Sequence, residues 1–449
     1  MRTPRRPARR EPAWFGRLPP PGKLVVFYIA FILAGAILLS LPIAHSDDVH
    51  PWQALFTAVS SVTVTGLAVV DTGSDFTPFG QMVMLLLIQA GGLGLMVFAA
   101  TLMSVLGVPL GMPQRQLLRE DLRQAANAGL GRIARRVLKI AAIAELAGVI
   151  ALSVVFVPDL GWSRGLWSAL FHTVSAFNNA GFALYPDSLS GWVGDWRVNL
   201  VIPALFIVGG LGFVVVGDVW EKRAWEPLAL HSKLMLAGTG VTLAVSFALF
   251  AALEWNNSGT LGPLAPGDRL WAAWFQAAAT RTAGFNTVDI TAIEDSTALL
   301  TMALMFVGAG PASTGGGIKI TTAIVAALAV VAFFKRRERL HAFGRSMGPN
   351  QVMKAMALIA LSATFIGIAL FLLTLTWEGR FIALVFEAVS AFGTVGLSMG
   401  ATAQLDVWGQ AVIMALMFVG RVGPLTLGFF IATRAAPRVQ YPRAEVFLG

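Results

Sequence analysis

Four short stretches of this chain place hydroxyl or amide side chains beside a single glycine, and such groups can bind a cation that has lost its water. The stretches read FTAVSSVTVTGL (56–67), FHTVSAFNNAGF (171–182), FQAAATRTAGF (275–285) and FEAVSAFGTVGLS (386–398). Each begins at Phe and reaches a glycine that is followed by Leu or Phe, and the third copy is one residue shorter. The shared pattern indicates four copies of one loop.

A cation filter needs residues of these types. A dehydrated cation must be met by oxygens that replace its water shell, and stacked backbone carbonyls can do this. Glycine permits the required backbone because it has no Cβ and accepts positive φ. A short helix before the loop would aim its negative C-terminal end, about half an elementary charge, at the ion. One such loop is more typical of a re-entrant or surface turn, whereas four at matching positions predict a filter. Its expected residues are Thr63, Val64, Thr65, Gly66, Asn178, Asn179, Ala180, Gly181, Thr282, Ala283, Gly284, Thr394, Val395 and Gly396.

The surrounding sequence predicts how these loops are held. Hydrophobic residues make up 56% of the chain and charged residues 13%, which is a membrane composition. Apolar runs occur at about 24–43, 80–106, 137–157, 199–217, 234–253, 297–334, 352–376 and 409–433. Helix-length pieces too short to cross a membrane precede each loop, at 52–61, 165–177, 268–279 and 380–391.

The order of span, half-helix, loop and span therefore occurs four times, and a glycine-rich cluster follows each loop glycine after 24 to 28 residues. Matching intervals indicate internal duplication. We expect an all-α polytopic membrane protein with eight transmembrane helices, in four parallel membrane–pore-helix–membrane repeats around a pseudo-fourfold pore. The predicted repeats are 24–106, 137–219, 234–334 and 352–433. The loops between them are 107–136, 220–233 and 335–351, and the tails are 1–23 and 434–449.

The charge distribution predicts the orientation of the chain. With the N-terminus inside, inner segments hold 26 Lys and Arg residues and outer segments hold 5. This asymmetry follows the positive-inside rule, so both tails are expected in the cytoplasm and the net charge of +9 requires no nucleic acid. Acidic residues of the outer segments could form a negative vestibule or simply belong to solvated loops. The chain has no cysteine, and its five histidines have no zinc-ligand spacing.

One predicted span contains a break, and another contains a charge. The run 297–334 is too long for one crossing, and Pro and Gly in its middle should interrupt the helix. A stripe of small residues for helix packing is the alternative. Arg421 lies in the last span, where a central charge costs at least about 2.5–3.5 kcal/mol. We expect it to lie in the pore against the loop. The alternative is pairing with a buried carboxylate, and the nearest acidic residue within a span, Glu145, is expected at the membrane surface because it lies near the inner end of its span. Lys319 could extend toward the inner surface. The predicted gate comprises Gly308, Ala309, Gly310, Pro311, Ala312, Ser313, Thr314, Gly315, Gly316, Gly317 and Arg421.

Several of these segments resemble the Trk/Ktr/HKT superfamily of potassium transporters, and most of all its bacterial Ktr-type translocating subunit. They are SVTVTGLAVVDTGSDF (61–76), SAFNNAGF (175–182), TRTAGFNT (280–287), GAGPASTGGGIK (308–319) and MFVGRVGPLT (417–426). The resemblance implies potassium at the four filter glycines, uptake through the bacterial plasma membrane, stimulation by sodium, and a homodimer surrounded by lipid. It also implies a cytoplasmic regulatory ring of the KtrA type that binds ATP/ADP or NAD.

Two other classes of function compete with this interpretation. A proton- or sodium-coupled carrier of another small solute or cation usually shows inverted repeats and intramembrane carboxylates, whereas these repeats are parallel and the spans hold almost no acid. A membrane enzyme would need a nucleophile–base or metal cluster, and the sequence shows none at a defined spacing. We therefore expect no enzymatic activity and no cofactor in this chain.

Overall fold

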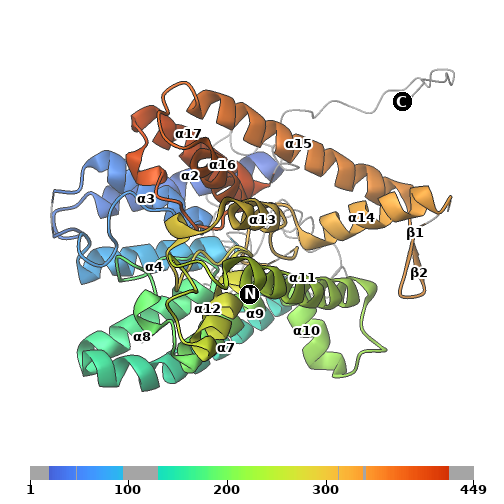
Figure 1. The fold of residues 1–449 in the computed structure, drawn as a ribbon, viewed down its shortest axis with the longest axis horizontal. Helices are drawn as coiled ribbons and strands as arrows, with labels where there is room; N and C mark the ends of the chain where they lie inside the picture. The colour runs from blue at the N-terminus through green and yellow to red at the C-terminus, as the bar shows by residue number, and fades with distance from the viewer. Residues whose placement is uncertain (1–19, 47, 95–129, 312, 337–339, 424–449) are drawn as a thin grey trace, which may run out of the picture.

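The computed structural model describes residues 20–46, 48–94, 130–311, 313–336 and 340–423. Within them, helices follow one another in a repeated order: a first helix, a short second helix, an irregular return and a closing helix (Figure 1). We call each such run a unit. Most of the predicted tail 1–23, most of the loop 107–136, Ala312 and the tail 434–449 lie outside the described residues.

The elements of the four units have the following bounds. The first helices are α2 (Pro20–Leu39), α7 (Leu130–Leu160), α11 (Leu230–Glu254) and α15 (Pro349–Leu373). The short second helices are α3 (Pro51–Thr63), α8 (Trp162–Phe177), α12 (Pro266–Ala279) and α16 (Phe381–Gly393). The closing helices are α4 (Pro78–Gly92), α9 (Trp196–Leu211) with α10 (Phe213–Lys222), α13 (Asp295–Phe306) with α14 (Ile320–Phe334), and α17 (Val407–Val422). Single 3-10 turns lie in three of the returns, η1 (Ser190–Trp192), η2 (Ile290–Ala292) and η3 (Thr402–Gln404).

The closing helices begin at side chains that cap them. Thr77, Asp195 and Asp406 each accept a hydrogen bond from a backbone N–H in the first turn of α4, α9 and α17. Such oxygens satisfy donors that a helix start leaves unpaired. The closing helix of each of these units therefore starts at a defined residue, directly after the return that follows the loop glycine.

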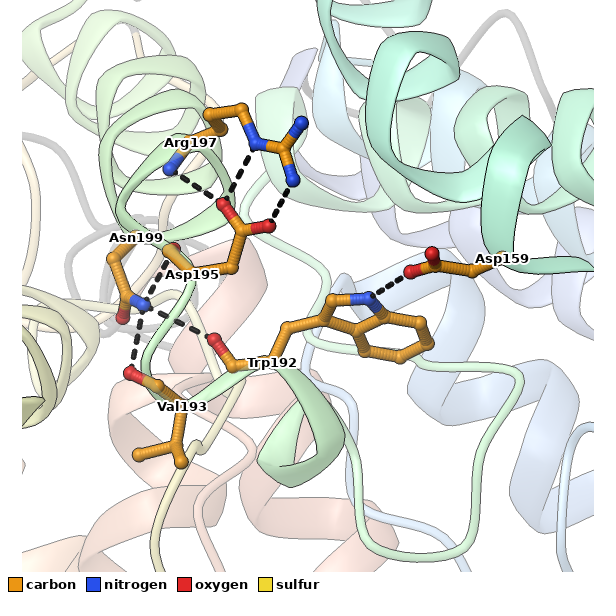
Figure 2. A network of polar contacts seen from close by, with 6 residues as sticks. All are labelled: Asp159, Trp192, Val193, Asp195, Arg197 and Asn199. Carbon is orange, nitrogen blue, oxygen red and sulfur yellow. Dashed lines mark hydrogen bonds and ion pairs between the residues drawn. The ribbon is translucent and has the colours of Figure 1, made fainter. Parts of the chain in front are cut away.

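The return before α9 is tied down by a polar network (Figure 2). Arg197 donates to both carboxylate oxygens of Asp195, at 3.0 and 2.5 Å. The Asn199 amide donates to the carbonyls of Trp192, Val193 and Asp195, at 2.8–3.2 Å. Trp192 reaches the end of α7 by donating to Asp159 at 3.0 Å. The hydrogen bond from Arg197 lowers the pKa of the Asp195 carboxyl below its ordinary value. This network joins the first helix, the return and the closing helix of the second unit.

The outside of the helical assembly is apolar. Ile37, Leu86 and Phe371 are 66%, 64% and 66% exposed, and other large apolar side chains are exposed on every first helix. Water would not favour such a surface, whereas lipid does, and helices satisfy their own backbone groups in lipid. The chain is a polytopic helical membrane protein.

Three described helices are long and apolar enough to cross a membrane by themselves: Arg135–Leu160 of α7, then α11 and α15. A fourth results if α9 and α10, which meet at 97°, count as one span. The remaining apolar helices are shorter, and α4 and α17 are described only as far as residues 94 and 423. The number of eight spans stays a prediction.

The structure departs from the expected elements in three places. The span expected at 199–217 bends at Gly212, whose φ of 90° suits glycine and few other residues. A hairpin of β1 (Leu340–Ala342) and β2 (Arg345–Met347) interrupts the all-α pattern between α14 and α15, and it projects from the end of α14 (Figure 1). The first helix of the second unit is already helical at Leu130, where the described residues resume, earlier than the apolar run at 137, because polar residues extend a helix beyond its apolar part.

Candidate functional site

The four loop glycines meet in a closed ring. Gly66, Gly181, Gly284 and Gly396 have φ angles of 89°, 72°, 76° and 93°. A Cβ built on any of them would come within 3.0 Å of a backbone oxygen of the next loop, in the order 66, 181, 284, 396 and back to 66. The oxygens approached are those of Ala180, Ala283, Val395 and Thr65. Only glycine fits these positions, because both the backbone conformation and the space exclude a side chain.

A second unusual residue lies two positions before each glycine. Val64, Asn179, Thr282 and Thr394 have φ angles between 50° and 66°, a left-handed conformation that asparagine tolerates and that is rare for the three β-branched residues. Such strain costs roughly 1–3 kcal/mol per residue and persists only where the surroundings impose it. The same left-handed backbone at four equivalent positions indicates that one function requires it.

The ring is bordered by backbone rather than by side chains. Among the predicted filter residues, only Gly66, Gly181 and Gly396 are partly exposed, and all the others are buried. The short helices end at or just before the strained residues, so their negative ends converge behind the ring. Backbone oxygen and helix ends of this sign suit a cation.

Serines hold three of the loops, and the sequence interpretation did not single them out. Ser60 and Ser390 accept hydrogen bonds from the N–H groups of Gly66 and Gly396, both at 3.1 Å, and Ser175 donates to the Phe182 carbonyl at 2.8 Å. Each serine lies four residues after the Phe that begins its stretch, so the spacing could have revealed them. The shorter third stretch has alanine there.

The second position of each stretch is also polar and buried, and in two units it anchors the return. Glu387 is fully buried, and its carboxylate accepts from two backbone N–H groups and two hydroxyls between residues 398 and 402, at 2.5–3.2 Å. His172 accepts from the Leu184 N–H at 3.3 Å. Both anchors reach a backbone N–H twelve residues downstream. Sequence reasoning missed this role because the partners lie in returns of dissimilar sequence.

The helix predicted to be interrupted over 297–334 is two helices, α13 and α14, with residues 307–319 between them. This segment contacts three units. Gly310 N–H donates to the Gly210 carbonyl at 2.8 Å, Gly316 N–H donates to the Thr394 hydroxyl at 3.0 Å, and Gly317 N–H donates to a carbonyl at the end of α17 at 3.3 Å. A Cβ on Gly315 or Gly316 would collide with the hydroxyl of Thr282 or Thr394. The segment therefore lies directly against the strained residues of the ring.

A side-chain bridge joins this segment to the second loop. Thr314 donates to the Asn179 side-chain oxygen at 2.6 Å, and the Asn179 amide donates to the Thr282 hydroxyl at 3.2 Å. All three side chains are fully buried. A movement of Thr314 would thus act on two of the four loops. Of the other predicted gate residues, Gly308 and Ala309 are buried, Pro311 and Ser313 are partly exposed, and Ala312 lies outside the described residues.

Arg421 connects the last helix to two other units. Its guanidinium donates to the carbonyls of Thr314, Gly91 and Gly92. The last two lie at the C-terminal end of α4, where a helix favours a cation. None of the ion pairs between described residues includes Arg421. Lys319 donates to the Gly315 carbonyl at 2.7 Å, so its amine lies against the segment and not toward a membrane surface.

The glycine-rich clusters mark close helix contacts. A Cβ on Gly91, Gly209 or Gly420 would collide with the backbone oxygen of Val62, Phe177 or Phe392. Each oxygen belongs to the C-terminal end of the short helix in the same unit. These glycines let the closing helices press against the ends of the short helices and so support the ring.

The family model described as "TrkH: Cation transport protein" matches residues 22–436. The chain belongs to the TrkH family of cation transport proteins. It is 45% identical over 433 residues to "Ktr system potassium uptake protein B" of Bacillus subtilis, with 96% of this chain and 97% of that protein covered. It is 36% identical to "Potassium/sodium uptake protein NtpJ" of Enterococcus hirae, with 96% and 98% covered. The crystal structure of the potassium transporter TrkH from Vibrio parahaemolyticus has the same fold, with a TM-score of 0.71 at 19% identity over 91% of this chain and 84% of that one.

Proposed function

We propose that this protein is the potassium-translocating subunit of a Ktr-type uptake system in the bacterial plasma membrane. The observation that carries the proposal is the ring of Gly66, Gly181, Gly284 and Gly396, where each glycine meets a carbonyl of the next loop. Stacked carbonyls can replace the water shell of potassium. Two relatives that cover 96% of the chain are described as a potassium uptake protein and a potassium/sodium uptake protein. Potassium is here the transported ion and not a resident cofactor.

The proposed filter combines backbone oxygen with four helix ends. The carbonyls of Thr65, Ala180, Ala283 and Val395 are the ligands that the ring geometry favours, since they lie at each junction between loops. The buried hydroxyl and amide side chains of the loops keep this backbone in place instead of binding the ion. Because these side chains differ from loop to loop, the filter is pseudo-fourfold, and we expect less strict selectivity than in a ring of identical chains.

The proposed gate is the segment 307–319 together with Arg421. The segment connects α13 to α14 and lies against the ring, and its hydrogen bonds reach the second, third and fourth units. Arg421 ties it to α4 and adds a positive charge that opposes cation occupancy. Opening then requires this segment to leave Thr394, Asn179 and Arg421, and the flexible glycines 315–317 allow the movement.

We also propose the wider assembly that the family resemblance implies. The excess of Lys and Arg on one side favours cytoplasmic tails and an outer mouth at the returns. A cytoplasmic nucleotide-binding ring would dock on the basic segments 115–139 and 335–345, a second copy of the chain would complete a homodimer, and sodium would act as an activator. The alternative, a coupled carrier of another solute, does not explain the ring of glycine and carbonyl groups.

Growth of a potassium-uptake-deficient bacterium at low potassium tests the proposal. The wild-type chain, co-expressed with its nucleotide-binding subunit, should restore growth and rubidium uptake, and sodium should increase the rate. A carrier of another solute would restore neither. If well-expressed complex in the membrane supports no potassium or rubidium uptake, the proposed function is wrong.

A further inference from the structure

A polar triangle of the half-buried Gln89 and Glu145 and the fully buried Asn178 lies behind the second loop. The Glu145 carboxylate, on the first helix α7, accepts a hydrogen bond from the Gln89 amide of α4 at 2.8 Å. The Gln89 side-chain oxygen accepts from the Asn178 amide at 2.6 Å, and Asn178 also approaches the same Glu145 oxygen at 3.4 Å. Asn178 ends the short helix α8 and is fully buried. Three helices of two units therefore meet at one carboxylate.

The carboxylate orients the other two side chains. The Glu145 Oε1 atom accepts from both amides, whereas an amide side chain has one donating and one accepting end. Glu145 therefore turns the amino end of Gln89 toward α7 and its oxygen toward Asn178. The second N–H of Asn178 is used by the Val174 carbonyl at 2.8 Å, so the Asn178 amide is held at both hydrogens. The residue that follows it, Asn179, is the strained residue of this loop.

This carboxylate is costly where it lies. Leu146 and Ile150, one and five residues after it on α7, are 63% and 61% exposed on the apolar outer surface, and none of the ion pairs between described residues includes Glu145. An ionisable side chain within a membrane helix is expensive and usually serves a function. At the position of Asn178, the other loops carry Thr63, Arg281 and Gly393, so the triangle is a feature of the second loop.

The triangle also adjoins the contact of Arg421. Gln89 lies in the last turn of α4, whose carbonyls at Gly91 and Gly92 accept from Arg421. A Cβ on Gly92 would collide with the Asn178 side chain. The last turn of α4 thus contacts both the Arg421 guanidinium and the side chains of Glu145 and Asn178.

We propose that Glu145 is a positioning residue that acts through Gln89 on Asn178 and so sets the geometry of the second quarter of the filter. It does not touch the ion. The inference rests on the proposed function, because its readout is the affinity and discrimination of cation uptake. Loss of the carboxylate frees Gln89 to turn, releases Asn178, and alters how the second loop meets the ring.

The test uses the full complex in uptake-deficient cells, with KM and maximal rate measured for potassium and rubidium. Glu145→Leu should raise the KM for potassium about tenfold, the effect of one lost hydrogen bond, and should change the ratio of the rubidium and potassium KM values. Glu145→Gln keeps an acceptor for Gln89 and should stay close to the wild type. Ser153→Ala is the matched control, since the Ser153 hydroxyl donates only to the Val149 carbonyl of the same helix at 2.6 Å.

An exchange of the two side chains gives a second measurement. Gln89→Glu alone places two carboxylates together and should impair uptake, whereas Gln89→Glu with Glu145→Gln restores one carboxylate with two amides and should recover the KM. If Glu145→Leu lowers only the maximal rate, or if the exchange recovers nothing, the inference is overturned, even where Glu145→Leu accumulates poorly. Absence of uptake by the wild type would instead overturn the proposed function and this inference with it.

Discussion

Replacement of Gly66 by Ser should disable the ring in a way that backbone strain alone does not. The φ of 89° at this residue costs a side chain about 1–2 kcal/mol. In addition, the new Cβ would lie within 3.0 Å of the Ala180 oxygen and 3.2 Å from the Gly181 Cα, and overpacking of this kind costs about 1–3 kcal/mol. Relief requires the Ala180 carbonyl to move, and this carbonyl is one of the proposed ligands.

If the overpacking cost of about 1–3 kcal/mol appears as lost binding free energy of potassium, the KM for potassium rises about 5- to 150-fold, because about 1.4 kcal/mol corresponds to a factor of ten. The assay is rubidium and potassium uptake over a range of concentrations, with the amount of protein in the membrane measured in parallel. Discrimination against sodium should fall as well, because the displaced carbonyl no longer completes the ring.

Gly161→Ser is the matched control. Gly161 has a φ of 81° and nothing lies within 4 Å of a Cβ built on it, so the change strains the backbone at a similar φ without the collision. Gly161→Ser should lower the thermal stability of the purified protein and leave KM and discrimination unchanged. Equal KM and equal discrimination in both variants, at equal amounts of protein, would refute the reasoning that places ions in this ring.

Three further predictions follow from the contacts around the ring. Arg421→Gln releases the Thr314 carbonyl and should raise rubidium influx in the resting complex about tenfold, since hydrogen bonds to charged groups contribute about 1.5–3 kcal/mol; unchanged influx and regulation would exclude a role in gating. Glu387→Leu leaves two N–H groups and two hydroxyls without their acceptor and should destabilise the protein by about 3 kcal/mol or more in thermal unfolding, whereas Glu387→Gln, of the same shape, should cost less. Asp195→Ala removes a helix cap and should cost about 1 kcal/mol at neutral pH. Because the pKa of Asp195 is lowered, its contribution is complete above the ordinary carboxyl pKa and is lost as pH falls through the lowered value, so unfolding curves of this variant and the wild type should converge only in strong acid.

The order of elements could be predicted because each depends on local composition. Apolar runs, the four loops and the break in 297–334 all follow from residues close in sequence, since an apolar helix, a glycine turn and a proline interruption each need only their neighbours. The glycines were identifiable for the same reason: a single glycine beside hydroxyl-bearing residues, four times, has few other uses. The bend at Gly212 was not identifiable, because glycine permits several conformations and the packing of α10 chooses one.

The contacts that complete the site were decided by the tertiary structure. Val64 and Thr394 take a backbone conformation that β-branched residues disfavour, so local preference argued against what the ring imposes. The partners of Arg421 are backbone carbonyls from other units. Because every residue has a carbonyl, the sequence does not indicate which ones accept from Arg421. The sequence predicted that Glu145 lies at the membrane surface, whereas the structure places the amides of Gln89 and Asn178 against its carboxylate.

The sequence by itself determined that four similar loops, each with a single glycine, are carried by membrane helices. The tertiary structure alone decided that the glycines close into one ring in the order 66, 181, 284 and 396, and which buried side chains hold each quarter. The physical reason is that a loop's conformation follows from its own residues, whereas a ring of carbonyls exists only when residues more than a hundred positions apart are packed together.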